Sequence, residues 1–217
     1  SLPLSPPHVW ASMRRAFSRC AIATVCSLVP MAANAYLVTI TAGTKAIFLQ
    51  VGTGTMTGGT FNNGGTPGNN GTVNVVSVTV PASSLGTGPL AMTPNVTVPT
   101  SPWDGYNFCP MASPVYIGGF YRGPGGGSAN LTVKSAANLV SGANNISFST
   151  ISWVSSGAGD AVPTLPSGTF VAGTTQTLRT IPNNNWFESC FQFTYANATA
   201  VPAGTFTGQA VYTLTAP

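Results

Sequence analysis

Short runs of strand-forming residues, each ended by glycine, proline or asparagine, recur along most of the sequence. Threonine, glycine and asparagine make up 68 of the 182 residues from 36 to 217. All three disfavour the interior of a helix, and threonine favours strands. The sequence therefore predicts an all-β protein. Strands are expected near residues 36–42, 45–51, 73–80, 115–121, 130–134, 146–154, 176–181, 186–195 and 206–215.

Two of these runs alternate clearly between two faces. In residues 206–214 one face has Phe206, Gly208, Ala210, Tyr212 and Leu214, and the other has Thr207, Gln209, Val211 and Thr213. In residues 187–195 three phenylalanines, including Phe191, share a face, and Cys190 points to the opposite one. Alternation with a period of two is typical of a strand with one buried face. Because there is no internal repeat and no linker-like change in composition, we expect a single antiparallel β-sandwich, Ig-like or jelly-roll-like.

The N-terminal region has the features of a cleavable export signal. Three arginines precede an apolar run at residues 20–31, and a small-x-small cleavage site ends at Ala35. The run is shorter than the roughly 20 apolar residues of a membrane span, and the order of features is that of a signal peptide. A buried N-terminal helix is the alternative. We expect residues 1–12 to be an upstream leader or a wrongly assigned start, 13–35 the signal peptide and 36–217 the sandwich domain.

An exported protein of this kind would pass through the periplasm to the cell surface, a fimbrium or the extracellular space. The whole chain has seven Lys or Arg, three Asp or Glu and a formal net charge of +4. Residues 36–217 keep four basic and three acidic side chains and have no histidine. So few basic residues argue against nucleic-acid binding, and the lack of histidine excludes a Ser/His/Asp triad. We therefore expect no enzymatic activity and no cofactor or metal.

The three acidic residues of that region, Asp104, Asp160 and Glu188, leave two chemical alternatives open. Two of them could converge as the paired carboxylates of a glycoside hydrolase. Aspartate side chains and loop carbonyls could also hold calcium, although the sequence has no Asp-rich loop. Both aspartates adjoin a glycine, so we interpret them as turn residues instead.

Two cysteines, Cys109 and Cys190, remain after the expected signal peptide. In an exported protein, an isolated pair of cysteines most simply forms one disulfide. Without histidine, the pair cannot complete a tetrahedral metal site, and neither thiol has a base to activate it. We therefore predict a Cys109–Cys190 disulfide that closes a loop of about 80 residues.

A second group of residues has the chemistry of a sugar-binding surface. Trp103, Asp104 and Tyr106 lie in an expected loop between prolines and Cys109. Together with Tyr121, these rings and the carboxylate could stack on a sugar and bind its hydroxyl groups. The alternative is that the rings cap the core, as large aromatic side chains usually do.

The glycine-rich stretch 52–71 has no apolar periodicity. We interpret it as a long solvated surface loop or a mobile hairpin tip, and the alternative is a loop that contacts a ligand or a partner. Its glycine spacing does not fit a phosphate-binding loop.

The C-terminal stretch resembles a known family. Residues 202–208 read PAGTFTG and residues 210–215 read AVYTLT, a small-Gly-Thr-aromatic turn followed by an alternating strand. This ending resembles the last strand of archaic chaperone–usher pilin subunits related to spore coat protein U. The resemblance covers roughly 14 of 182 residues. The chain departs from that family in its greater length, in the late position of its first cysteine and in its Ala216-Pro217 ending.

The resemblance implies a subunit that lacks one strand and receives it from the N-terminal extension of a neighbour. The donor would be residues 36–41, which place Tyr36, Val38 and Ile40 on one face; alternatively, this segment is the domain's own first strand. Copies of itself or related surface subunits would be the partners, with a periplasmic chaperone before assembly. The sequence thus favours a non-enzymatic surface structural or adhesive protein. A secreted carbohydrate-binding module, with glycans as partners, is the alternative.

Overall fold

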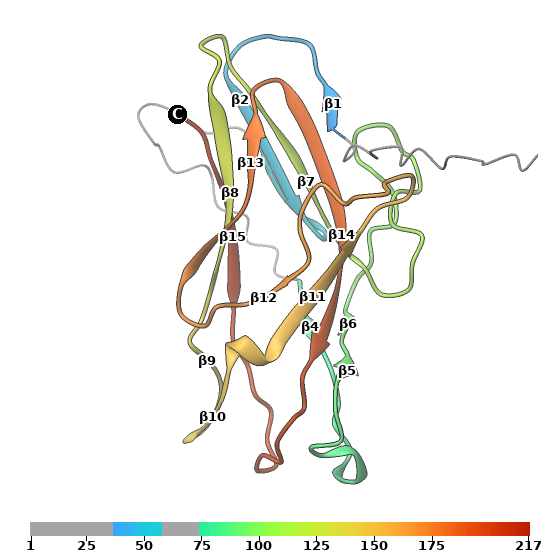
Figure 1. Cartoon of the computed structure of the whole chain (residues 1–217), viewed down its shortest axis with the longest axis vertical. Coiled ribbons are helices and arrows are strands. Elements are labelled where there is room, and N and C mark those ends of the chain that lie inside the picture. Colours follow the sequence, from blue (N-terminus) through green and yellow to red (C-terminus); the bar gives the residue numbers. More distant parts are fainter. Residues whose placement is uncertain (1–36, 58–73) are drawn as a thin grey trace, which may run out of the picture. The chain divides into compact units, whose positions relative to one another are not determined.

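The recurring threonine- and valine-rich runs form strands throughout the described part of the chain (Figure 1). A computed structural model describes residues 37–57 and 74–217. The strands are β1 (Leu37–Thr39), β2 (Ala46–Val51), β3 (Gly54–Thr57), β4 (Val76–Ser77), β5 (Leu90–Ala91), β6 (Thr93–Pro94), β7 (Val115–Arg122), β8 (Ser128–Ser135), β9 (Asn138–Ser141), β10 (Asn144–Ser147), β11 (Ile151–Ser156), β12 (Gly168–Thr169), β13 (Thr175–Pro182), β14 (Asn185–Tyr195) and β15 (Ala210–Thr215). Within these two ranges there are two short 3₁₀ turns, η1 (Ala82–Ser84) and η2 (Phe148–Thr150), and no α-helix. The predicted all-β class is confirmed.

The larger sheet has eight strands and is organised around β14. Its order is β12-β11-β14-β7-β2-β3, and β1 and β5 also pair with β14. The eleven residues of β14 are long enough to hold two partners on each edge. The first half pairs with β7 on one edge and β1 on the other, and the second half pairs with β5 and β11. Every one of these pairings is antiparallel.

A second, smaller sheet has three strands in the order β13-β8-β15, again all antiparallel. Two short ribbons, β9–β10 and β4–β6, complete the pairings of the described residues. Because β8 lies in the middle, β13 and β15 each have one edge that pairs with no other described strand.

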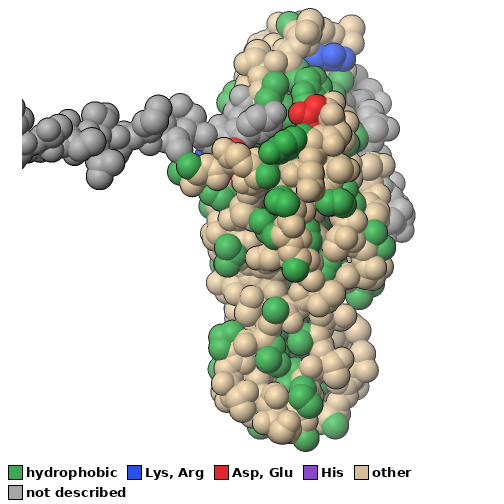
Figure 2. All heavy atoms as spheres, turned by 90° about the vertical axis from the view of Figure 1, so that its right-hand side faces the viewer, with side chains coloured by type: hydrophobic (Ala, Val, Ile, Leu, Met, Phe, Trp, Pro, Cys, Tyr) green, Lys and Arg blue, Asp and Glu red, His purple; other side chains and the backbone are tan. Residues whose placement is uncertain are grey.

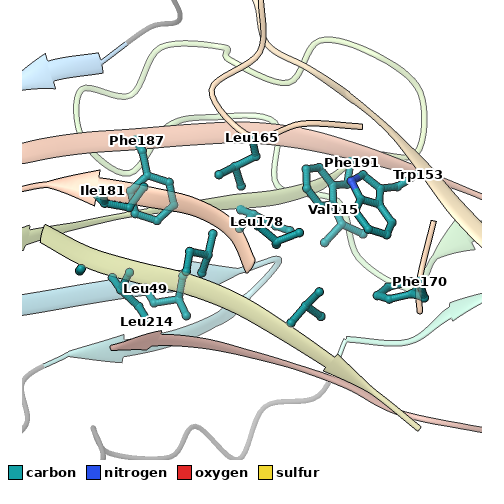
Figure 3. Close-up of a cluster of buried hydrophobic side chains, with 14 of the residues drawn as sticks. Leu49, Val115, Trp153, Leu165, Phe170, Leu178, Ile181, Phe187, Phe191 and Leu214 are labelled. Atoms are coloured by element: carbon teal, nitrogen blue, oxygen red, sulfur yellow. The ribbon is translucent and has the colours of Figure 1, made fainter. Parts of the chain in front are cut away.

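Apolar side chains from both sheets meet in one buried cluster (Figure 3). The larger sheet contributes Leu49, Val115, Trp153, Phe187 and Phe191, and the smaller sheet contributes Leu131, Leu178, Ile181 and Leu214. Phe191 stacks on Trp153 with ring centroids 5.5 Å apart. Leu165 enters the same cluster from the segment between β11 and β12, where its N–H donates to Ser189 Oγ at 2.9 Å. Removing these side chains from water is the main force that holds the two sheets together.

The alternating faces predicted for β14 and β15 are also confirmed. Phe187, Phe191 and Phe193 face the main core, whereas Cys190 belongs to a second buried cluster. On β15, Leu214 is buried in the main core and Val211 is 50% exposed.

The limits of the elements differ from the prediction in several places. β4 covers only two residues of the strand expected at 73–80, and η2 interrupts the strand expected at 146–154. No strand was expected at β5, β6 or β12. Within the glycine-rich stretch, β3 pairs with β2 as the start of a hairpin, where a long surface loop or a hairpin tip was expected. The β9–β10 hairpin was also unexpected, because it contains three asparagines, a residue that is depleted in strands. β15 begins at Ala210 rather than at residue 206, and Thr207 makes a single bridge to Val140. Residues 58–71 of the glycine-rich stretch and the predicted signal region, residues 1–35, lie outside the described residues.

Asparagine side chains close several loops by taking the place of backbone groups. The Asn183 side chain accepts from the N–H of Gly123 and donates to its C=O, both at 2.7 Å. Asn74 accepts from the Thr53 N–H at 3.2 Å and donates to the Val51 C=O at 2.7 Å. An amide side chain offers both an acceptor and donors, so it can replace a missing strand partner. Part of the asparagine content of this chain therefore serves loop closure.

Asn197 holds the loop that contains η1. Its Nδ2 donates to the C=O groups of Ser84 (2.6 Å) and Gly88 (3.0 Å), and its Oδ1 accepts from the Gly86 N–H at 3.2 Å. The residue is 1% exposed and has a φ of 43°, in the left-handed region. Asparagine tolerates this backbone conformation better than most residues.

Replacing Asn197 with alanine is expected to lower the free energy of unfolding by about 2–3 kcal/mol. The change removes three hydrogen bonds and leaves alanine in a left-handed conformation. Asn197→Gly, which removes the bonds but accepts the positive φ, should lie between alanine and wild type. Asn145→Ala, at an exposed position of β10, serves as the control. Urea denaturation measures all four proteins, and equal midpoints for Asn197→Ala and the control would contradict this role.

Candidate functional site

The outer face of the larger sheet, which is turned away from the main core, is partly covered by residues 98–112. We call these residues the covering segment. Its Phe108 and Cys109 form a second buried cluster with Tyr116 of β7 and Cys190 of β14. At its C-terminal end, the Ala112 C=O accepts a hydrogen bond from Gln192 Nε2 at 2.8 Å. The central strands β7 and β14 are therefore buried on both faces in this region.

The predicted disulfide between Cys109 and Cys190 is present. The two residues are 81 positions apart in sequence, with their Cα atoms 5.7 Å apart. Both cysteines are buried. The bond joins the covering segment to the middle of β14.

A buried polar pair lies beneath the covering segment. The Tyr116 hydroxyl donates to Glu188 Oε2 at 2.7 Å, and Glu188 is only 1% exposed. Burial, and then the negative charge of Glu188, raise the pKa of Tyr116 well above its ordinary value. The neighbouring Gly118 leaves room for this contact, since a Cβ atom there would overlap the Tyr116 hydroxyl. Glu188 thus ties β14 to β7 and is shielded from solvent.

Four aromatic rings form a stack further along the same outer face. We call Phe48, Phe120, Trp186 and Trp103 the aromatic stack. The ring centroid of Trp186 lies 5.7 Å from that of Phe48, 6.2 Å from that of Phe120 and 5.4 Å from that of Trp103. Trp186 is 2% exposed, whereas Trp103 is 45% exposed. Trp103 therefore covers Trp186 with part of its ring and leaves the rest open.

Trp103, Asp104 and Tyr106 lie together in one tight turn of the covering segment. Asp104 Oδ1 accepts from the Tyr106 N–H at 2.9 Å, and Ser101 Oγ accepts from the Trp103 N–H at 3.2 Å. The turn is closed by a hydrogen bond from the Gly105 N–H to the Ser101 C=O at 2.9 Å. Tyr106 is 55% exposed. Three of the four residues expected to bind a ligand are thus neighbours at the surface.

Tyr121, the fourth residue of that set, lies on the opposite face of β7. Its ring is buried in the main core, and its hydroxyl donates to the Gly126 C=O at 3.3 Å. Side chains of a strand alternate between its faces, so Phe120 belongs to the aromatic stack and Tyr121 to the core. The structure therefore separates Tyr121 from Trp103, Asp104 and Tyr106.

The N-terminal segment considered as a donor strand forms β1 of its own chain. Val38 pairs in register with Trp186, and the Ile40 N–H donates to the Asn184 C=O at 2.8 Å. Ile40 is buried, and Tyr36 lies outside the described residues. Only three residue pairs join β1 to β14, so β1 has a small share of the sheet's pairing.

The outer edge of β15 makes no backbone hydrogen bond with the rest of the described chain. The Ala136 N–H donates to the Gln209 C=O at 2.9 Å. This bond shows which residues of β15 direct their backbone groups toward β8. In antiparallel pairs the hydrogen-bonded positions alternate, so the N–H and C=O groups of Ala210, Tyr212 and Leu214 point away from β8. The Tyr212 hydroxyl is buried and has no hydrogen-bond partner among the described residues.

No group of three or more His, Cys, Asp or Glu in residues 37–57 and 74–217 is placed to bind a metal ion. In the same ranges, the structure has no helix long and apolar enough to cross a membrane. Comparisons with protein-family models, curated proteins and solved structures find no match. The features that bear on function are therefore the covering segment, the aromatic stack and the edge of β15 that no other described strand pairs with.

Proposed function

We propose that the chain is an exported, non-enzymatic structural or adhesive subunit of a cell surface, and that it assembles with copies of itself or related subunits by strand addition. The two facing sheets would form a single antiparallel β-sandwich of the Ig-like or jelly-roll-like kind. The observation that carries this proposal is the outer edge of β15, which pairs with no other strand among the described residues. Its outward-pointing backbone groups are a template for another strand.

The added strand in this proposal is residues 36–41 of a neighbouring copy. Three residue pairs hold the corresponding strand, β1, to its own sheet, whereas β15 makes six pairs with β8. Short edge strands belong to the parts of a protein that open most easily. The segment can therefore leave β14 of its own chain at modest cost and pair with the longer edge of β15 in the next.

The nearly uncharged surface supports close association of identical subunits. Residues 36–217 carry a formal net charge of only +1, and Figure 2 shows a face on which charged side chains are few among apolar and neutral polar ones. Like charges that face each other across an interface between copies cost free energy. With so few charges, this repulsion is small. Solubility rests instead on hydroxyl and amide groups.

Val211→Lys is expected to weaken assembly at least tenfold in association constant while leaving the monomer folded. Val211 is exposed on the edge strand β15, and a lysine on an edge strand opposes the addition of another strand. Val154→Lys makes the same change at a similarly exposed valine of β11 and should assemble like wild type. Multi-angle light scattering over a concentration series measures the three proteins.

Two outcomes would contradict the proposal. One is a wild-type protein that stays monomeric at every concentration, and the other is equal weakening by both lysine substitutions. A third variant that lacks residues 36–40 tests the donor segment. It should remain folded by circular dichroism and lose assembly, because it keeps the β15 edge but has no strand to add.

A further inference from the structure

We propose that Trp103, Tyr106 and Asp104 form a binding site for neutral sugar rings on the covering segment. Trp103 supplies a stacking surface, Tyr106 a second aromatic wall, and Asp104 an acceptor for hydroxyl groups. The site lies on the outer face of the larger sheet, away from the edge of β15. The covering segment takes no part in the strand addition proposed above, so the sugar site can be tested separately from it.

The first support is the exposure of two large aromatic rings that follow closely in sequence. Trp103 is 45% exposed and Tyr106 55% exposed. Large aromatic side chains are usually buried, so two exposed rings in one turn indicate a contact surface. The ring centroids of Trp103 and Trp186 are 5.4 Å apart. One side of the Trp103 ring therefore packs on Trp186, and another remains open to a ligand.

The second support is that the turn is held in place before any ligand arrives. Hydrogen bonds join Ser101 to Tyr106 (2.8 Å), Gly105 to Ser101 (2.9 Å) and Cys109 to Pro99 (2.8 Å) through their backbones. The disulfide then fixes Cys109 to β14. A loop already ordered in its binding conformation loses little conformational entropy when the ligand binds.

The third support is the polar chemistry of the turn. Asp104 uses Oδ1 for the Tyr106 N–H, and its exposed carboxylate has further lone pairs that can accept hydrogen bonds from hydroxyl groups. A sugar ring combines a flat face of C–H groups with a rim of hydroxyl donors, which matches an aromatic surface beside an acceptor. The negative charge of Asp104 disfavours phosphates, sulfates and uronic acids. The chemistry thus favours a neutral glycan over an anionic one or a nucleic acid.

Affinity electrophoresis of the purified full chain tests the site, with gels that contain neutral glucan, galactomannan or xylan and with anionic alginate for comparison. At least one neutral polysaccharide should retard the wild-type protein, and alginate should not. Trp103→Ala is expected to weaken binding about tenfold or more, and Tyr106→Ala about three- to tenfold. Val154→Ala, at an exposed valine of β11, should bind like wild type.

Thermal denaturation of each variant shows whether Trp103→Ala disturbs the aromatic stack. If it does, Tyr106→Ala still tests the site. The Tyr106 ring is more exposed than that of Trp103, so its loss should leave the melting temperature nearly unchanged. The proposal is overturned if no neutral polysaccharide is retained, or if the variants at Trp103 and Tyr106 bind as well as wild type. It is equally overturned if alginate or single-stranded DNA binds at these residues in place of neutral sugars.

Discussion

Replacing both Cys109 and Cys190 with alanine is expected to lower the free energy of unfolding by about 4 kcal/mol. The disulfide joins residues 81 positions apart, and a cross-link of that span restricts the unfolded chain by roughly 4–5 kcal/mol. Both cysteines also pack with Phe108 and Tyr116 in the second buried cluster. If the urea m-value is about 2 kcal/mol/M, the unfolding midpoint should fall by about 2 M.

The loss should appear first in the covering segment. Its remaining contacts with the rest of the chain include the hydrogen bond from the N–H of Ala158, in the turn that follows β11, to the Phe108 C=O at 2.9 Å. We expect the Ala158 amide to exchange much faster in the double variant, while amides at the centre of β8 change only with global stability. A reducing agent should bring the wild-type midpoint down to that of the variant and leave the variant unchanged. Equal midpoints for wild type and variant would contradict this account, once mass spectrometry has shown the wild-type bond to be formed.

The parts of the structure that the sequence predicted are those governed by alternation. In β14, the phenylalanines at positions 187, 191 and 193 fall on one face by the period of two, and the structure places them in the main core. The same rule put Cys190 on the opposite face, where the disulfide forms. The site residues Trp103, Asp104 and Tyr106 were predictable as a group because they are close in sequence.

The remaining features depend on contacts between segments far apart in sequence. Alternation indicated a strand with one buried face, but the covering segment buries the other face as well, so Trp186 and Glu188 are both enclosed. Nothing local distinguishes Glu188 from a solvated carboxylate, because its partner Tyr116 is 72 positions away. Tyr121 is separated from Trp103 because the face of β7 that carries Tyr121 turns toward the core. Which face does so is decided only when β2 and β14 pair with β7.

Gly119→Ala is expected to be the most damaging single substitution tested, with a loss of about 3 kcal/mol or more. Gly119 pairs with Leu49 where β7 and β2 meet. A Cβ atom at this position would overlap the Phe48 carbonyl oxygen and lie 3.0 Å from its carbonyl carbon. Both are backbone atoms, so the clash can be relieved only by moving β2 away from β7. That movement would disturb Leu49 in the main core and Phe48 in the aromatic stack.

The matched control is Gly125→Ala, in the turn that follows β7. A Cβ atom there meets nothing within 4 Å, so alanine should be neutral or stabilise by up to about 1 kcal/mol through a less flexible unfolded chain. In urea denaturation, the free energies of unfolding of the Gly119→Ala and Gly125→Ala variants should thus differ by about 3 kcal/mol or more. Near-equal midpoints would show that β2 and β7 can separate freely. In that case the close approach of these strands could not be what supports the aromatic stack and the proposed sugar site above it.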